Sequence, residues 1–90
     1  MENKQSTIDE RVFQDLVSII DEWKEESHYR FPILIGRYYN SGLTLCTTYP
    51  GRLIGFRGEL VRKYLDKIRM ISKYETIQYI NWVETMNLIA

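Results

Sequence analysis

The sequence predicts an α+β fold, a two-layer sandwich in which a three-stranded mixed sheet carries its helices on one face. Two segments have apolar residues at helical spacing, and three others are rich in β-forming residues. The third β-rich segment follows a helical crossover, so its strand should run parallel to the strand before it, whereas a tight turn makes the first pair antiparallel. The expected order is helix, strand, strand, short helix, helix, strand, or α-β-β-α-α-β.

The first helix is expected at about residues 8–25, where Ser6 or Thr7 can cap it and Asp9 or Glu10 follows three residues later. Apolar residues recur every three or four positions, and acidic residues cover the other side. We therefore expect this stripe to be core rather than binding surface. Its members are Ile8, Val12, Phe13, Leu16, Ile19, Ile20 and Trp23.

A β-hairpin should follow the first helix. Pro32 forces the residue before it out of helical geometry, and we interpret His28 in this connection as a loop residue rather than a catalytic base. Residues 33–39 and 43–48 are rich in β-formers, and the turn-forming sequence Asn-Ser-Gly separates them at residues 40–42.

The second half of the chain begins with a short helix at about residues 52–54, which Gly55 interrupts. A longer helix is expected at about residues 59–72 and a third strand at residues 76–83. The apolar positions of the longer helix are Val61, Leu65, Ile68, Met70 and Ile71.

The composition limits the classes of protein to consider. Ninety residues suffice for one domain, which we place at residues 1–90 with a core at about 8–83. Cys46 and His28 are the single cysteine and histidine, so we expect no intramolecular disulfide, no His/Cys metal site and no cofactor. We expect Cys46 to be a half-buried thiol rather than a nucleophile. With no apolar run near the roughly 18–20 residues that span a bilayer and no leader-like N-terminus, we expect a cytoplasmic protein without membrane contact.

The net charge is zero, which by itself argues against a nucleic-acid partner, but the charges are unevenly distributed. Residues 1–29 carry −5, and residues 30–90 carry +5. The basic excess is densest at residues 52–69, where six basic residues meet two acidic ones. Such a segment can attract phosphates locally, although two ordinary solvated helices of opposite sign would give the same pattern.

Gly55 and Gly58 stand between the two expected helices with Phe56 and Arg57 between them. Glycine adopts positive φ without a Cβ penalty, so the chain can turn sharply, and a ligand's backbone can come close to the peptide. The N-terminal end of the following helix and the charge of Arg57 add a favourable field for an anion. These features suit a sugar-phosphate chain.

The residues around this loop resemble the signature of the KH (K homology) family. That signature reads roughly Gly-x-[Ile/Val]-Ile-Gly-x-x-Gly-x-x-[Ile/Val], and the Pro-Gly before it and Glu59 after it look most like the KH domains of bacterial small-subunit ribosomal proteins. The expected order of elements is also similar to the type II, prokaryotic arrangement of that family. The signature positions are filled by Gly51, Leu53, Ile54, Gly55, Gly58 and Val61.

The resemblance implies non-catalytic binding of single-stranded RNA, or of single-stranded DNA, in a groove where the loop clamps about four backbone nucleotides. It implies that Gly55, Phe56, Arg57 and Gly58 form the clamp. It places Ile54 and Val61 in the apolar floor, with Arg52, Arg62 and Lys63 near the phosphates. Groove positions on the sheet would come from Arg37, Tyr39, Thr44 or Cys46.

Phe56 departs from the family pattern, in which the residues inside the loop are commonly basic or small. Its ring could stack on a base, fill a pocket of a partner, or mark weakened phosphate binding. The alternative function is therefore a KH-like scaffold that binds another polypeptide, or a homo-oligomer built through the C-terminal strand. An enzyme is not expected, because the sequence has no catalytic triad, metal-ligand spacing or phosphate-loop lysine.

Overall fold

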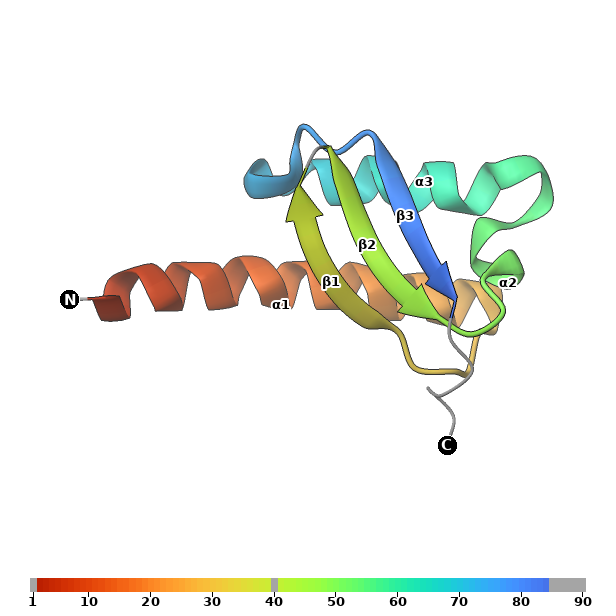
Figure 1. Cartoon of the computed structure of the whole chain (residues 1–90), viewed down its shortest axis with the longest axis horizontal. Coiled ribbons are helices and arrows are strands. Elements are labelled where there is room, and N and C mark those ends of the chain that lie inside the picture. Colours follow the sequence, from red (N-terminus) through yellow and green to blue (C-terminus); the bar gives the residue numbers. More distant parts are fainter. Residues whose placement is uncertain (1, 40, 85–90) are drawn as a thin grey trace.

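The computed structural model describes the backbone of residues 2–39 and 41–84, and the side chains of residues 10–36 and 41–84. Its elements follow the expected order, with two short 3-10 turns, η1 and η2, in addition (Figure 1). They are α1 (Glu2–Ser27), β1 (Leu34–Tyr39), β2 (Gly42–Thr47), α2 (Gly51–Ile54), η1 (Phe56–Gly58), α3 (Glu59–Arg69), η2 (Ser72–Tyr74) and β3 (Tyr79–Glu84).

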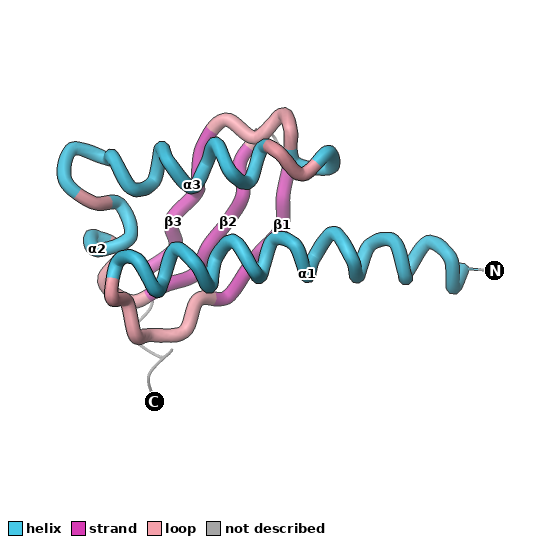
Figure 2. Tube along the Cα trace, turned by 180° about the vertical axis from the view of Figure 1, so that it is seen from behind, coloured by secondary structure: helices cyan, strands magenta, loops and turns pink. Residues whose placement is uncertain are grey.

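The described strands form one three-stranded sheet in the order β1-β2-β3. β1 pairs with β2 antiparallel, and β3 pairs with β2 parallel, so the predicted mixed sheet is confirmed. Seen from behind, α1 and α3 both lie across one face of this sheet, whereas no helix covers the other face among the described residues (Figure 2). The α+β fold with helices on one face is therefore confirmed as well.

The two faces of the sheet differ in burial along β2 and β3. Leu43, Leu45 and Thr47 are buried, and Ile80 is buried on the neighbouring strand, so these side chains face the helices. The residues between them face the open side. There the register aligns Leu34, Cys46 and Val83 in one row across the three strands.

The core lies between the sheet and the two long helices. Leu16, Ile20 and Trp23 of α1 are buried, as the apolar stripe predicts. The prediction is wrong for Phe13, which is 45% exposed, and for Met70, which is 84% exposed. Met70 follows the last residue of α3, so helical spacing no longer determines where its side chain points.

α1 is longer than predicted at both ends. It begins at Glu2, so the prediction that Ser6 or Thr7 caps it is wrong, and the sequence before Ser6 contains the good helix formers Glu, Lys and Gln. At the other end, His28 adopts a left-handed conformation with φ of 56°. The amide of Tyr29 donates to the carbonyl of Lys24 at 2.9 Å, and that of His28 donates to Glu25 at 3.3 Å. This is a Schellman cap, and it ends α1 well before Pro32.

α3 is shorter than predicted, because it ends at Arg69 instead of residue 72. Ile71 is extended, with φ of −81° and ψ of 121°, and η2 follows it. The break brings the buried Tyr74 and Ile77 into the core ahead of β3. β3 accordingly begins three residues later than predicted, at Tyr79, while the other strand ends shift by at most one residue.

Candidate nucleic-acid interface

The loop from Gly55 to Gly58 makes a sharp turn that requires glycine at its first position. Gly55 has φ of 79°, and a Cβ added there would lie 2.9 Å from the Cβ of Leu60. Gly58 has φ of 75°, but its nearest neighbour, Val61, would be 3.8 Å away. The amide of Gly58 donates to the carbonyl of Gly55 at 3.2 Å and closes the turn. Gly55 is therefore fixed by conformation and space, and Gly58 by conformation alone.

Phe56 and Arg57 project from this turn into solvent. Phe56 is 74% exposed, and the guanidinium of Arg57 lies 5.1 Å from the centroid of its ring. Arg57 itself has a left-handed backbone, with φ of 55° and ψ of 26°. An aromatic face and a positive charge are thus presented side by side, which suits a base and a phosphate of one strand.

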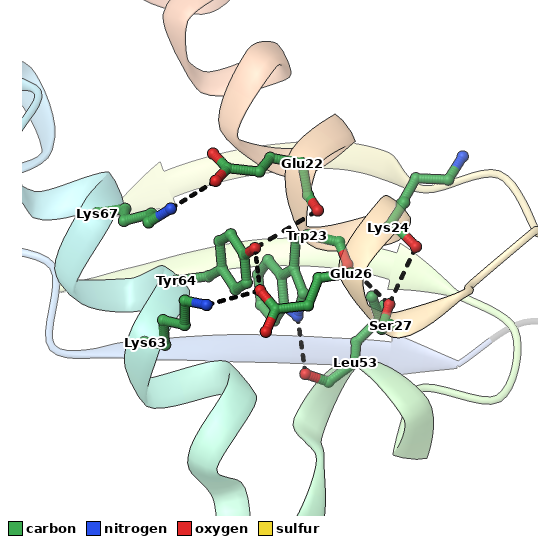
Figure 3. A network of polar contacts seen from close by, with 9 residues as sticks. All are labelled: Glu22, Trp23, Lys24, Glu26, Ser27, Leu53, Lys63, Tyr64 and Lys67. Carbon is green, nitrogen blue, oxygen red and sulfur yellow. Dashed lines mark hydrogen bonds and ion pairs between the residues drawn. The ribbon is translucent and has the colours of Figure 1, made fainter.

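The chain that leads into the loop is bonded to α1. Leu53 is fully buried, and its carbonyl accepts a hydrogen bond of 2.8 Å from the indole Nε1–H of Trp23 (Figure 3). Trp23 in turn stacks on Tyr64 of α3, with ring centroids 5.3 Å apart and planes within 7°. One buried aromatic pair therefore links α1, α2 and α3 directly beneath the loop.

Ion pairs extend this junction between α1 and α3 (Figure 3). Lys63 Nζ lies 2.7 Å from Glu26 Oε1, and Lys67 Nζ lies 2.6 Å from Glu22 Oε2. Tyr64 donates its hydroxyl hydrogen to Glu26. The hydrogen bond from Lys63, and then that from Tyr64, lowers the pKa of Glu26. Burial, and then the hydrogen bond to Glu26, raises the pKa of Tyr64 well above its ordinary value.

The basic segment divides into two groups at this junction. Arg52, Arg57 and Arg62 are exposed, and Arg62 Nη2 donates to the carbonyl of Arg57 at 3.2 Å, so its guanidinium lies at the loop. The second group, consisting of Lys63, Lys67 and Arg69, has acidic partners on α1 or α3. The structure thus gathers two predicted site residues, Arg57 and Arg62, at the loop, and it places Lys63 against Glu26.

The remaining predicted positions lie in two environments. Ile54 and Val61 are half-buried on either side of the loop, and Val61 packs against the core. Thr44 and Cys46 are half-buried on the open face of the sheet, where Thr44 accepts a hydrogen bond of 3.3 Å from Asn81. The side chains of Arg37 and Tyr39 lie outside the described residues.

Trp23 and Tyr64 are site-supporting residues that the sequence-based prediction of the site missed. The apolar spacing places Trp23 in the core stripe, and it gives Tyr64 no role. The available signal was chemical, since a buried indole or phenol needs a hydrogen-bond partner. The spacing could not identify that partner, because Trp23 and Leu53 are 30 residues apart.

Comparisons with protein-family models, with curated proteins and with solved structures find no match to this chain. In the part of the chain that the structure describes, no helix has the length and apolar character to cross a membrane. Across the same residues, no group of three His, Cys, Asp or Glu side chains is placed to hold a metal ion.

Proposed function

We propose that this chain binds single-stranded RNA, or single-stranded DNA, through the loop from Gly55 to Gly58, without catalysing a reaction, in the manner of a type II KH domain. Phe56 and Arg57 would contact a base and a phosphate, and Arg52 and Arg62 would contact further phosphates. Ile54 and Val61 would form the apolar floor beside the glycines.

The observation that carries this proposal is the loop itself. It joins two helices through a turn that only glycine fits at Gly55, and it exposes Phe56 and Arg57 while Trp23 anchors the chain before it. Phe56 is 74% exposed and lies beside the guanidinium of Arg57, so the loop presents an aromatic ring next to a positive charge. The sheet agrees with the type II arrangement in its order, with the last strand parallel to the one before the helices.

Fluorescence anisotropy with short single-stranded RNAs tests the proposal. Binding should weaken as salt rises, and with about three phosphates neutralised the log–log slope should be roughly −2. Replacing Phe56 and Arg57 together by Asp should abolish binding and leave the circular dichroism spectrum unchanged, because both side chains are exposed.

A matched control tests whether the loss of RNA binding depends on where in the protein the negative charge is introduced. Met70→Asp introduces the same charge at another strongly exposed apolar residue, just beyond the end of α3 that is far from the loop. This variant should bind RNA like the wild type, whereas Phe56→Asp should not. The absence of binding to pooled RNA and DNA at low salt would contradict the proposal.

A second candidate is a protein-interaction module, which the open face of the sheet favours. Leu34 is 54% exposed and Val83 is 41% exposed, and both flank Cys46 in the same cross-strand row. β3 also lies at an edge of the sheet, where it could pair with a second copy of the chain. Residues 85–90, which follow it, lie outside the described residues. Sedimentation velocity at increasing protein concentration would reveal self-association at this edge.

A further inference from the structure

A pocket of about 610 Å³ lies at the other end of α2 from the glycine loop. It is formed where the connection after α1 meets the connection between β2 and α2, so it belongs to neither of the long helices. Its volume falls within the roughly 300–1,000 Å³ of small-molecule sites. The residues that line it are His28, Tyr29, Arg30, Phe31, Tyr49, Gly51 and Arg52.

Three aromatic rings form one wall of this pocket, and their exposure to solvent increases from Tyr29 to Phe31 to Tyr49. Tyr29 is 4% exposed, and its hydroxyl is fixed because it donates to the carbonyl of Thr48 and accepts from the Thr48 amide at 3.1 Å. The Phe31 ring lies 5.6 Å from Tyr29 and 5.6 Å from Tyr49. Tyr49 is 61% exposed. The Phe31 and Tyr49 rings are tilted by 60° to each other, so a planar ligand between them would stack on one ring and meet the edge of the other.

The backbone at Tyr49, which carries the most exposed of the three rings, is strained. Tyr49 has φ of 57°, a left-handed conformation that a bulky residue seldom adopts and that a following proline such as Pro50 further disfavours. Such strain persists where the surrounding structure enforces it and is concentrated at ligand sites. At His28 the left-handed conformation already serves as the cap of α1, but at Tyr49 it ends no helix.

The polar side chains of the pocket favour an anion. Basic residues enter from both connections, namely His28, Arg30 and Arg52, and no carboxylate is among the described lining residues. Neither Arg30 nor Arg52 forms an ion pair with another described residue. A guanidinium without an acidic partner beside an aromatic wall suits a phosphate attached to a planar ring.

We infer that this pocket binds a nucleotide, with its base against Phe31 and Tyr49 and its phosphate near Arg30 and Arg52. The nucleotide can be free in solution, or it can be one end of an RNA strand held by the glycine loop. The second source rests on the proposed function. A strand held by the glycine loop can reach the pocket, because the four residues of α2 span only about 6 Å between the pocket and the loop.

Two titrations of the whole chain separate these sources. In the first, AMP and UMP are added to ¹⁵N-labelled protein, and the amide signals of Phe31, Tyr49 and Gly51 are followed by NMR. In the second, anisotropy compares oligo-A and oligo-U RNAs of four and eight nucleotides. Tyr49→Leu removes the exposed ring, and Tyr79→Leu is the control, because Tyr79 is 50% exposed on the open face of the sheet.

For an RNA strand, we expect the octamer to bind more tightly than the tetramer, and Tyr49→Leu to weaken octamer binding at least about fivefold while tetramer binding changes less than twofold. Tyr79→Leu should change neither. For a free nucleotide, AMP or UMP should shift the three amide signals in the wild type and not in Tyr49→Leu. If Tyr49→Leu fails to fold, Arg30→Gln takes its place with the same expectations, because Arg30 is exposed, lines the pocket and is not among the proposed loop contacts.

Other outcomes overturn one idea or the other. Shifts with AMP but no binding of any RNA or single-stranded DNA would support the nucleotide pocket and refute the proposed function. RNA binding that Tyr49→Leu leaves unchanged at both lengths, or weakens equally at both, together with no shift from AMP or UMP, would refute the pocket and leave the proposed function standing.

Discussion

Single residues determine which of the basic side chains are available to a ligand. Arg62 and Lys63 are neighbours in the sequence, and both were predicted to contact phosphates. On the helix they point in different directions, because consecutive residues lie about 100° apart around its axis. Arg62 reaches the loop carbonyl of Arg57, whereas Lys63 reaches Glu26 on α1.

This difference gives a prediction for a matched pair of variants. Arg62→Gln should weaken RNA binding and reduce the magnitude of the salt slope by about 0.7, the value for one phosphate on a single strand. Lys63→Gln should leave the slope unchanged, because its ammonium is paired with Glu26 in the free protein. Anisotropy titrations at three or more salt concentrations measure both slopes. Equal effects of the two substitutions would show that Lys63 leaves Glu26 to bind a phosphate.

At the scale of elements, the opposite charges of the two long helices meet at their contact. The sequence places its acidic excess in the first 29 residues and its basic excess after them. Part of the acidic excess and part of the basic excess neutralise each other in the ion pairs Glu22–Lys67 and Glu26–Lys63. The basic segment therefore divides into paired residues, such as Lys63 and Lys67, and Arg52, Arg57 and Arg62, which form no ion pair with another described residue.

The contact between α1 and α3 predicts how stability depends on pH. The pKa of Glu26 is lower in the folded chain than its ordinary value of 4.5, so its contribution to stability is present above that value and is lost as the pH falls through the folded pKa. The free energy of unfolding should therefore decrease below about pH 4.5. Glu26→Gln should make this decrease shallower, as measured by urea denaturation between pH 3 and pH 7, taken as roughly the range over which carboxyl groups titrate.

Glu25→Gln serves as the control, because Glu25 is exposed and forms no ion pair among the described residues. In this variant the free energy of unfolding should decrease at acid pH as it does in the wild type. If Glu26→Gln does not alter the decrease in the free energy of unfolding at acid pH, the bonds of Glu26 to Lys63 and Tyr64 contribute nothing to stability.

At the scale of the whole molecule, the sheet has one structural face and one open face. The helices cover Leu45, which is fully buried, but Leu34 on the next strand is 54% exposed. Leu45→Ala should therefore lower the free energy of unfolding by about 2–5 kcal/mol. Leu34→Ala should change it by about 1 kcal/mol or less. Urea denaturation of both variants measures the difference, and equal losses would mean that something covers the open face in solution.

Local patterns were sufficient to predict the order of elements and the mixed sheet. Helical spacing identified the stripe of α1, and the crossover through α2 and α3 determined the parallel pairing of β3. The helix ends were wrong where a backbone conformation decided them, as at His28 and Ile71. The support beneath the loop and the aromatic pocket were missed, because each joins segments that lie far apart in the sequence.

The hydrogen bond from Trp23 to Leu53 has a consequence for sequence variation. This bond holds the chain just before the glycine loop, while the side chains of Phe56 and Arg57 are exposed. These two side chains therefore contribute little to folding. Phe56 is thereby free to change under selection for a ligand alone, and Arg57 is free among the residues that tolerate a left-handed backbone. A library randomised at these two positions should consist mostly of folded proteins, and its members should differ in what they bind rather than in whether they fold.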